Sequence, residues 1–182
     1  ENPVINYRSF GENPQRVARL AQALYQGLEE GGVMACAKHF PGHGDTRVDS
    51  HKDLPVIPKS YQQLKNMELV PFNKLIRSGV PAIMTAHLNL PQLDSTLNLP
   101  ASLSPVVASD ILQDSMGFRG LIVTDALEMQ GVKKHFTDRE IAVMAFQAGS
   151  HILLLPQNAY EAASALEQAL EKGVFSIDEL NR

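Results

Sequence analysis

The stretch KHFPGHGDTRVDSH, residues 38 to 51, gathers the side chains of this sequence that are best suited to chemistry. It places three histidines and two aspartates around a Pro-Gly-His-Gly turn, directly after the short apolar run VMACA. Side chains of these types can bind a metal ion, help to bind phosphate or transfer protons. Each of these three kinds of site requires a different spacing of the residues.

A metal site would use the imidazoles of His39, His43 and His51 together with the carboxylate of Asp45 or Asp49. The sequence has neither the HExxH spacing of a helical zinc site nor the paired cysteines of a zinc knuckle. The spacing therefore disfavours a metal site.

A phosphate loop requires a glycine-rich turn that opens a helix, with its lysine after the second glycine. Here Lys38 precedes the turn that contains Gly42 and Gly44 instead of following it, so a phosphate loop is disfavoured further. For any single histidine of the stretch, a hydrogen bond to local backbone groups remains an equal alternative to a functional role.

Proton transfer fits the spacing of Asp49 and His51. Residues two apart share a face of an extended segment, so the carboxylate can orient the imidazole and favour its protonated form. A nucleophile to complement this pair is available in Asp125, at the end of the apolar run in GLIVTDAL. An aspartate after a strand is often a helix cap instead, and the residues alone leave both interpretations open.

Short apolar runs alternate with amphipathic segments along the chain, a pattern typical of a parallel α/β fold. Asn13 and Pro14 are suited to begin a helix, and Pro71 should interrupt another. Helices are expected over 13–30, 61–79, 104–118, 139–148 and 158–173, and strands near 33–37, 80–86, 120–124 and 151–155.

Three polar residues, His39, His87 and Asp125, come at or just past the ends of these expected strands. Active sites of (β/α)8 barrels are built at this rim, so the placement favours a barrel over a doubly wound sheet. Four strand and helix units amount to half of such a barrel.

Composition and charge disfavour two classes of protein, those that bind nucleic acid and those that span a membrane. A chain of 182 residues with 44% hydrophobic and 20% charged residues is typical of one soluble domain, and a net charge of −4 disfavours nucleic acid as a partner. No apolar run reaches the roughly 18 residues that a membrane span requires. The only cysteine, Cys36, lies in the apolar run VMACA, so we expect a buried, unreactive thiol.

Three segments, KHFPGHGDTRVDSH, GVPAIMTAHLNLP and GFRGLIVTDALEMQGV, together resemble glycoside hydrolase family 3, specifically the bacterial exo-β-N-acetylglucosaminidases that trim muropeptides. The likeness runs from NPVINYRSFG to at least AGSHILLLP, which is most of the chain. It implies a (β/α)8 barrel or a close variant, a small carbohydrate as substrate, and no cofactor or metal. It also implies retaining hydrolysis of terminal N-acetylglucosamine through a covalent glycosyl-enzyme intermediate.

The resemblance also implies roles for single residues. Those that match family positions are the nucleophile Asp125, the histidine acid/base His51 with its dyad partner Asp49, and the sugar-binding residues Arg8, Lys38 and His39. A histidine suits a leaving group that carries its own carboxylate, such as an N-acetylmuramoyl unit, because a carboxylate acid/base would repel that anion. Lys38 and His39 can donate hydrogen bonds to sugar hydroxyls.

Residues 1–182 are thus expected to form a partial catalytic domain that lacks the N-terminal strands of the barrel, which would leave sheet edges open to self-association. Whether the piece is active alone is left open. The enzymatic alternative is a β-glucosidase of the same family, although those enzymes usually draw a carboxylic acid/base from a later domain. The other alternative is a noncatalytic carbohydrate-binding module, which the presence of Asp125 and the Asp49 and His51 pair disfavours.

Overall fold

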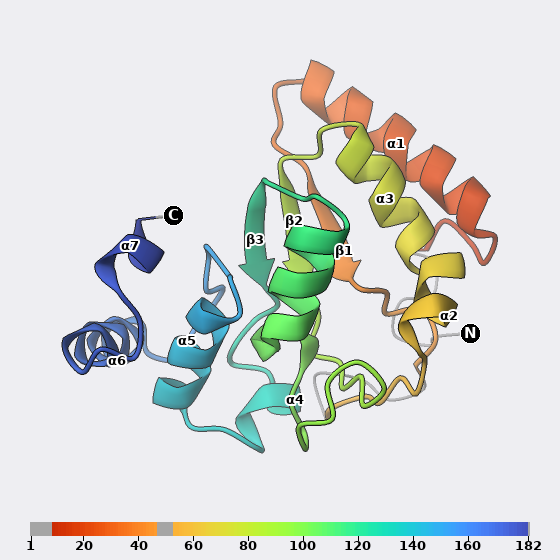
Figure 1. Ribbon diagram of the computed structural model, residues 1–182. Coiled ribbons are helices and arrows are strands. Elements are labelled where there is room, and N and C mark those ends of the chain that lie inside the picture. Colours follow the sequence, from red (N-terminus) through yellow and green to blue (C-terminus); the bar gives the residue numbers. More distant parts are fainter. Residues whose placement is uncertain (1–8, 47–52, 182) are drawn as a thin grey trace.

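A parallel three-stranded sheet forms the centre of the computed structural model, which describes residues 9–46 and 53–181 (Figure 1). The strands β1 (Cys36–Phe40), β2 (Ala82–Thr85) and β3 (Leu121–Thr124) lie in the order β1-β2-β3, and both pairs are parallel. The parallel α/β architecture expected from the sequence is confirmed. Arg8, Asp49 and His51 lie outside the described residues.

The helices α1 (Pro14–Glu30) and α3 (Leu69–Arg77) lie side by side against this sheet (Figure 1). As expected, α1 begins after Asn13, whose side chain accepts hydrogen bonds from two backbone amides of the first turn. The segment 61–79 divides into α2 (Tyr61–Asn66) and α3. The break precedes Pro71, which lies in the first turn of α3 where no backbone N–H is needed.

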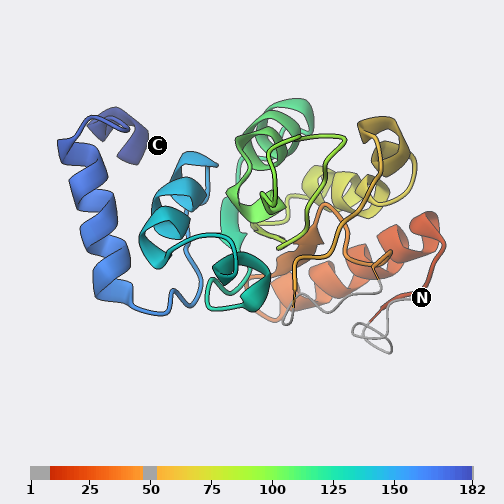
Figure 2. The ribbon, with the colours of Figure 1, turned by 90° about the horizontal axis from the view of Figure 1, so that it is seen from below.

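The remaining helices come after β2 in the chain. The π-helix η3 (Val106–Ser115) joins β2 to β3 after the short 3₁₀ turn η2 (Ala101–Leu103). Beyond β3 come α4 (Gln130–Lys133), α5 (Asp138–Gln147), α6 (Ala159–Glu171) and α7 (Ile177–Leu180). In Figure 2, α6 and α7 extend to one side, and α6 packs on α5. Among the described residues, no helix combines the length and apolar character that crossing a bilayer requires.

The first strand begins three residues later than predicted from the sequence. Val33 does not belong to it, because its N–H donates to the carbonyl of Leu28 and so closes the end of α1, with Gly32 at a φ of +74°. Lys38 and His39 therefore lie inside β1 rather than in the loop that follows it.

The prediction of a buried Cys36 is wrong, because its side chain is exposed on β1, at the edge of the described sheet. Partial desolvation nevertheless raises the pKa of its thiol, and the charge of Lys38 opposes this shift.

The predicted fourth strand, 151–155, is reduced to a single parallel bridge between Val123 and Ile152. Side chains interrupt the ladder on both sides. The ring Nδ1 of His151 accepts the backbone N–H of Ile122, and the hydroxyl of Thr124 accepts the N–H of Leu154. The segment thus follows β3 without forming a regular strand.

Candidate active site

Asp125 follows the last residue of β3 and is held there by two hydrogen bonds. Its backbone N–H donates to the carbonyl of Thr85 at 2.9 Å, and its Oδ1 accepts the N–H of Ala126 at 2.9 Å. The side chain is 14% exposed. One carboxylate oxygen is thereby fixed, while the side chain keeps access to solvent at the carboxyl end of the sheet.

His39 faces this carboxylate from the other outer strand. Its Nε2 lies 3.9 Å from Oδ2 of Asp125, and its side chain is 18% exposed. This separation is too long for a hydrogen bond but short enough for a protonated imidazole to stabilise the carboxylate. The expectation that His39 and Asp125 share one rim is confirmed, because parallel strands bring their carboxyl ends to the same edge.

Lys38 belongs to the irregular part of β1. The register with β2 shifts between Ala37 and Phe40, and the peptide bonds Lys38–His39 and Phe40–Pro41 are cis. The side chain of Lys38 is exposed. Lys38 thus directly precedes His39 in the chain, but its amine forms no hydrogen bond or ion pair with the side chain of His39 or Asp125.

His43 is engaged in local hydrogen bonds. It is 7% exposed, and its Nδ1 lies 3.1 Å from the hydroxyl of Thr46, which itself donates to the carbonyl of His43. Its ring also lies edge-on to that of His39, with centroids 5.7 Å apart. For His43 the local structural interpretation fits best. Within residues 9–46 and 53–181, no three His, Cys, Asp or Glu side chains are grouped to hold a metal ion.

A cluster of three charged side chains, of which only Glu68 is nearly buried, fixes the turn that carries His43, and no local sequence pattern marks it. Nζ of Lys59 lies 2.7 Å from Oδ2 of Asp45 and also donates to Oε1 of Glu68, whose side chain is only 9% exposed. A Cβ at Gly42 would lie 2.7 Å from the Glu68 side chain. The turn is therefore packed tightly onto the junction of α2 and α3.

Charge pairing controls the titration of Lys59. Burial alone would lower its pKa, but hydrogen bonds with Asp45 and Glu68 raise the pKa above its usual value. The stability that Lys59 contributes is therefore fully present below the pKa of an unfolded lysine, about 10.4, and is lost as the pH rises through the folded value.

We expect the substitution Lys59→Met to lower the free energy of unfolding by about 1–3 kcal/mol at pH 7, because it leaves the Glu68 carboxylate buried without its cation. The difference from wild type should shrink as the pH rises above about 10.4. Urea unfolding between pH 7 and 11 measures both effects. The exposed Lys65 of α2 offers a matched control, and Lys65→Met should change stability by less than about 0.5 kcal/mol. Equal effects of the two substitutions would contradict the assignment.

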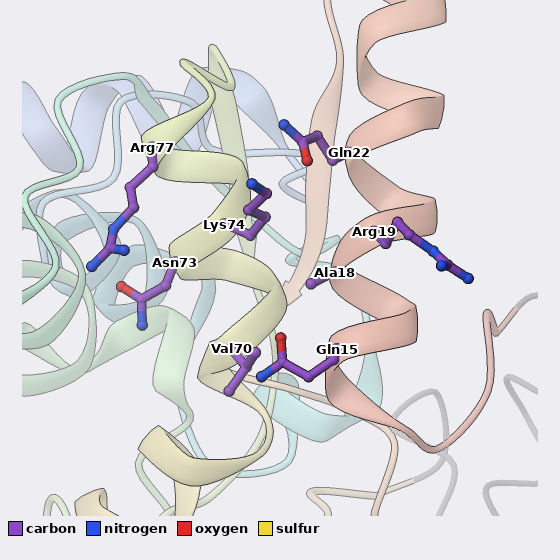
Figure 3. Close-up of a pocket in the computed structure, with 8 residues that line it drawn as sticks. All are labelled: Gln15, Ala18, Arg19, Gln22, Val70, Asn73, Lys74 and Arg77. Carbon is purple, nitrogen blue, oxygen red and sulfur yellow. The ribbon is translucent and has the colours of Figure 1, made fainter.

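Among the described residues, one surface pocket lies between two helices and another includes the residue next to Asp125. The pocket in Figure 3 measures about 530 Å³ and lies between α1 and α3. Its two arginines, Arg19 and Arg77, point away from each other, so they do not converge on a ligand (Figure 3). The other, of about 590 Å³, is lined by Ala126, Glu128, Met129, Gln130, Leu155 and Gln157. Its lining includes Ala126, the residue that follows Asp125, but not Asp125 itself.

A model of the glycosyl hydrolase family 3 N terminal domain matches residues 1–182. The chain belongs to glycosyl hydrolase family 3. The family resemblance seen in the sequence is thereby confirmed, and so is the barrel-type fold, of which the described sheet and its helices form a part.

Solved structures of family 3 enzymes agree with this assignment. The glycoside hydrolase family 3 β-N-acetylglucosaminidase from Paenibacillus sp. str. FPU-7 superposes with a TM-score of 0.95 at 40% identity, over 99% of this chain and 35% of that one. NagZ from Neisseria gonorrhoeae, in complex with N-trifluoroacetyl-D-glucosamine, superposes with a TM-score of 0.80 at 39% identity, over 92% of this chain and 48% of that one.

Curated family 3 relatives are also similar. A β-hexosaminidase of Neisseria meningitidis serogroup C (strain 053442) is 44% identical over 153 residues, which are 84% of this chain and 42% of the relative. β-Hexosaminidase A of Pseudoalteromonas piscicida is 39% identical over 165 residues, covering 85% of this chain and 28% of the relative. The chain thus spans less than half the length of these relatives.

Proposed function

We propose that this chain is part of the catalytic domain of a retaining glycosidase that removes terminal β-linked N-acetylglucosamine. The observation that carries the proposal is the Asp125 carboxylate, with one oxygen anchored by Ala126 and the other facing His39 at the carboxyl end of the sheet. A fixed, partly exposed carboxylate at this position of a family 3 domain is suited to attack an anomeric carbon.

In the first step, an oxygen of Asp125 bonds to C1 of the sugar while the bond from C1 to the leaving oxygen breaks. The imidazolium of His51, oriented by Asp49, gives its proton to the leaving oxygen. In the second step, the neutral His51 takes a proton from water while the water oxygen bonds to C1. The bond from C1 to the Asp125 oxygen breaks, which frees Asp125. The roles of His51 and Asp49 rest on the sequence motif, since both residues lie outside the described ones.

His39 supports the same step in two ways. Its imidazole can donate a hydrogen bond to a sugar hydroxyl, and when protonated it favours the ionised form of the Asp125 carboxylate 3.9 Å away, which is the form that can attack. Lys38, exposed on the same strand, and Arg8 are proposed to bind the sugar at its nonreducing end, as the family motif implies. These contacts favour catalysis to the extent that they strengthen in the oxocarbenium-like transition state.

The names of the relatives support N-acetylglucosamine as the sugar, because they include β-hexosaminidases and β-N-acetylglucosaminidases at 39–44% identity. Muropeptide fragments fit best as the natural substrate, since a histidine acid/base avoids placing a second carboxylate near the muramoyl carboxylate. A second candidate is a β-glucoside-specific enzyme. The β-glucoside phosphorylase BglX also superposes with a TM-score of 0.91, although at the lower identity of 30%.

Hydrolysis of nitrophenyl N-acetylglucosaminide and of nitrophenyl glucoside by the full-length protein separates these candidates. We expect kcat/KM to be at least about 10²-fold higher for the N-acetylglucosaminide, because the acetamido group offers contacts that the glucoside lacks. Repeating both assays with added phosphate tests for phosphorolysis. A preference for the glucoside, or turnover that requires phosphate, would contradict the proposal.

A further inference from the structure

His87 is completely buried behind the turn that carries Asp125. It follows β2, its exposed fraction is 0%, and both of its ring nitrogens have partners. Nε2 lies 2.9 Å from the carbonyl oxygen of Ala126, and Nδ1 lies 2.7 Å from the hydroxyl of Ser102, which is also completely buried. The prediction that His87 comes just past the end of a strand is confirmed, but its side chain is buried rather than exposed at the rim.

The partners decide where the proton of this histidine lies. A carbonyl oxygen can only accept, so Nε2 must carry the proton that it donates to Ala126. In the neutral ring, Nδ1 then accepts the hydroxyl proton of Ser102. Ser102 is itself fixed, because its backbone N–H donates to the carbonyl of Ala86 next to His87. Ser102 thus holds His87 in the tautomer that binds Ala126.

Ala126 is held on both of its backbone groups by this arrangement. Its N–H donates to Oδ1 of Asp125, and its carbonyl accepts from His87. The backbone N–H of Asp125 is tied in turn to Thr85. Thr85, at the end of β2, therefore holds the backbone N–H of Asp125, and His87, two positions further on, holds the carbonyl of Ala126.

We propose that His87, kept in one tautomer by Ser102, is a positioning residue that holds the peptide of Ala126 and thereby aims the carboxylate of Asp125 at the substrate. The proposal rests on the proposed function, in which Asp125 is the nucleophile. In this role His87 acts through the peptide of Ala126 and does not itself take part in the reaction. A displacement of a reacting group by about 1 Å can cost about 10²-fold in rate, so this support matters to catalysis.

Three substitutions in the full-length protein test this role. His87→Leu removes the donor to Ala126 and should lower kcat by about 10²-fold, while KM stays within roughly twofold. His87→Gln keeps an amide N–H near the position of Nε2 and should recover most of that loss. Ser102→Ala keeps His87 but frees its tautomer, and it should lower kcat by about 10-fold or less. Ser102→Ala also keeps the proposal open to test if His87→Leu does not fold.

Ser109 provides a matched control. Its hydroxyl donates to the carbonyl of Ala148 at 2.9 Å, a bond between residues 39 apart in sequence that involves neither Asp125 nor the residues that hold it. Ser109→Ala should lower stability without lowering kcat. Equal losses of kcat in Ser109→Ala and Ser102→Ala would show a general loss of stability and would overturn the proposal.

Crystal structures of wild type, His87→Leu and Ser102→Ala separate a failure of this proposal from a failure of the proposed function. We expect the Asp125 carboxylate to shift by about 1 Å or to become disordered in His87→Leu, whether or not the protein hydrolyses N-acetylglucosaminides. An unmoved carboxylate would overturn the positioning role even in an active enzyme. A displaced carboxylate in a protein without glycosidase activity would overturn the proposed function and leave the structural part of the inference standing.

Discussion

Replacing Asp125 with alanine is expected to lower kcat/KM for nitrophenyl N-acetylglucosaminide by about 10⁴–10⁶-fold, because removing a nucleophile that acts together with an acid/base removes the whole covalent route. Steady-state hydrolysis by the full-length protein measures the loss, and thermal unfolding shows whether the fold is kept. The matched control is Asp110→Ala, which removes an exposed carboxylate from η3 and should leave kcat/KM unchanged.

Azide distinguishes a lost nucleophile from a damaged site. In the space left by Asp125→Ala, azide can attack C1 directly while the nitrophenolate departs, which produces an α-glycosyl azide with inverted configuration. We expect this product with the Asp125→Ala variant and not with wild type. Hydrolysis by Asp125→Ala within about 10-fold of wild type would contradict the nucleophile assignment.

Replacing His51 with alanine should produce a loss that depends on the leaving group. A natural disaccharide needs a proton on its departing oxygen, whereas a nitrophenolate needs it far less. The rate of glycosylation should therefore fall about 10²–10⁴-fold more for the disaccharide than for the nitrophenyl substrate. Single-turnover kinetics with both substrates in the full-length protein measures this difference.

Water attack on the intermediate should slow as well in His51→Ala, and azide should restore turnover of the nitrophenyl substrate, because azide needs no general base. Asp49→Ala should show a milder form of the same pattern, since the imidazole stays but loses its orientation and charge support. The exposed His135 offers a control, and His135→Ala should affect both substrates equally little. Equal, large losses on both substrates in His51→Ala, with lower thermal stability and no rescue by azide, would assign His51 a structural role instead.

The meeting of Asp125 and His39 could be predicted from the sequence because it depends on a property of parallel sheets. Each residue comes near the end of an apolar strand, and neighbouring parallel strands end at one edge. The helix that begins after Asn13 was predictable for a similarly local reason, since a capping side chain and a following proline act within one turn.

Contacts between distant segments could not be predicted in the same way. The bonds of His87 to Ser102 and Ala126 join residues 15 and 39 positions apart, and no local pattern marks them. The same holds for the bond of Lys59 to Asp45, which depends on how the turn packs against α2 and α3. Sequence periodicity identifies the elements, but the packing between them decides which polar side chains meet.

Side chains that compete for backbone groups explain the errors in the strands. His151 and Thr124 take up main-chain N–H groups that a regular fourth strand would have used, and periodicity does not report such competition. At the first strand the competitor is the backbone itself, because the N–H of Val33 bonds to the end of α1 and the strand begins later than predicted. The exposure of Cys36 follows from the position of β1 at the edge of the described sheet, which an apolar run cannot reveal.

The most direct test of the central claim is to identify the residue that carries the sugar. The full-length protein is treated with a slow fluorinated N-acetylglucosaminide that forms the glycosyl-enzyme faster than water removes it, then digested and analysed by tandem mass spectrometry. The account predicts one sugar per molecule, attached through an ester to Asp125, and no label in Asp125→Ala. A sugar attached to any other residue, or turnover of the reagent with no covalent species at all, would contradict it.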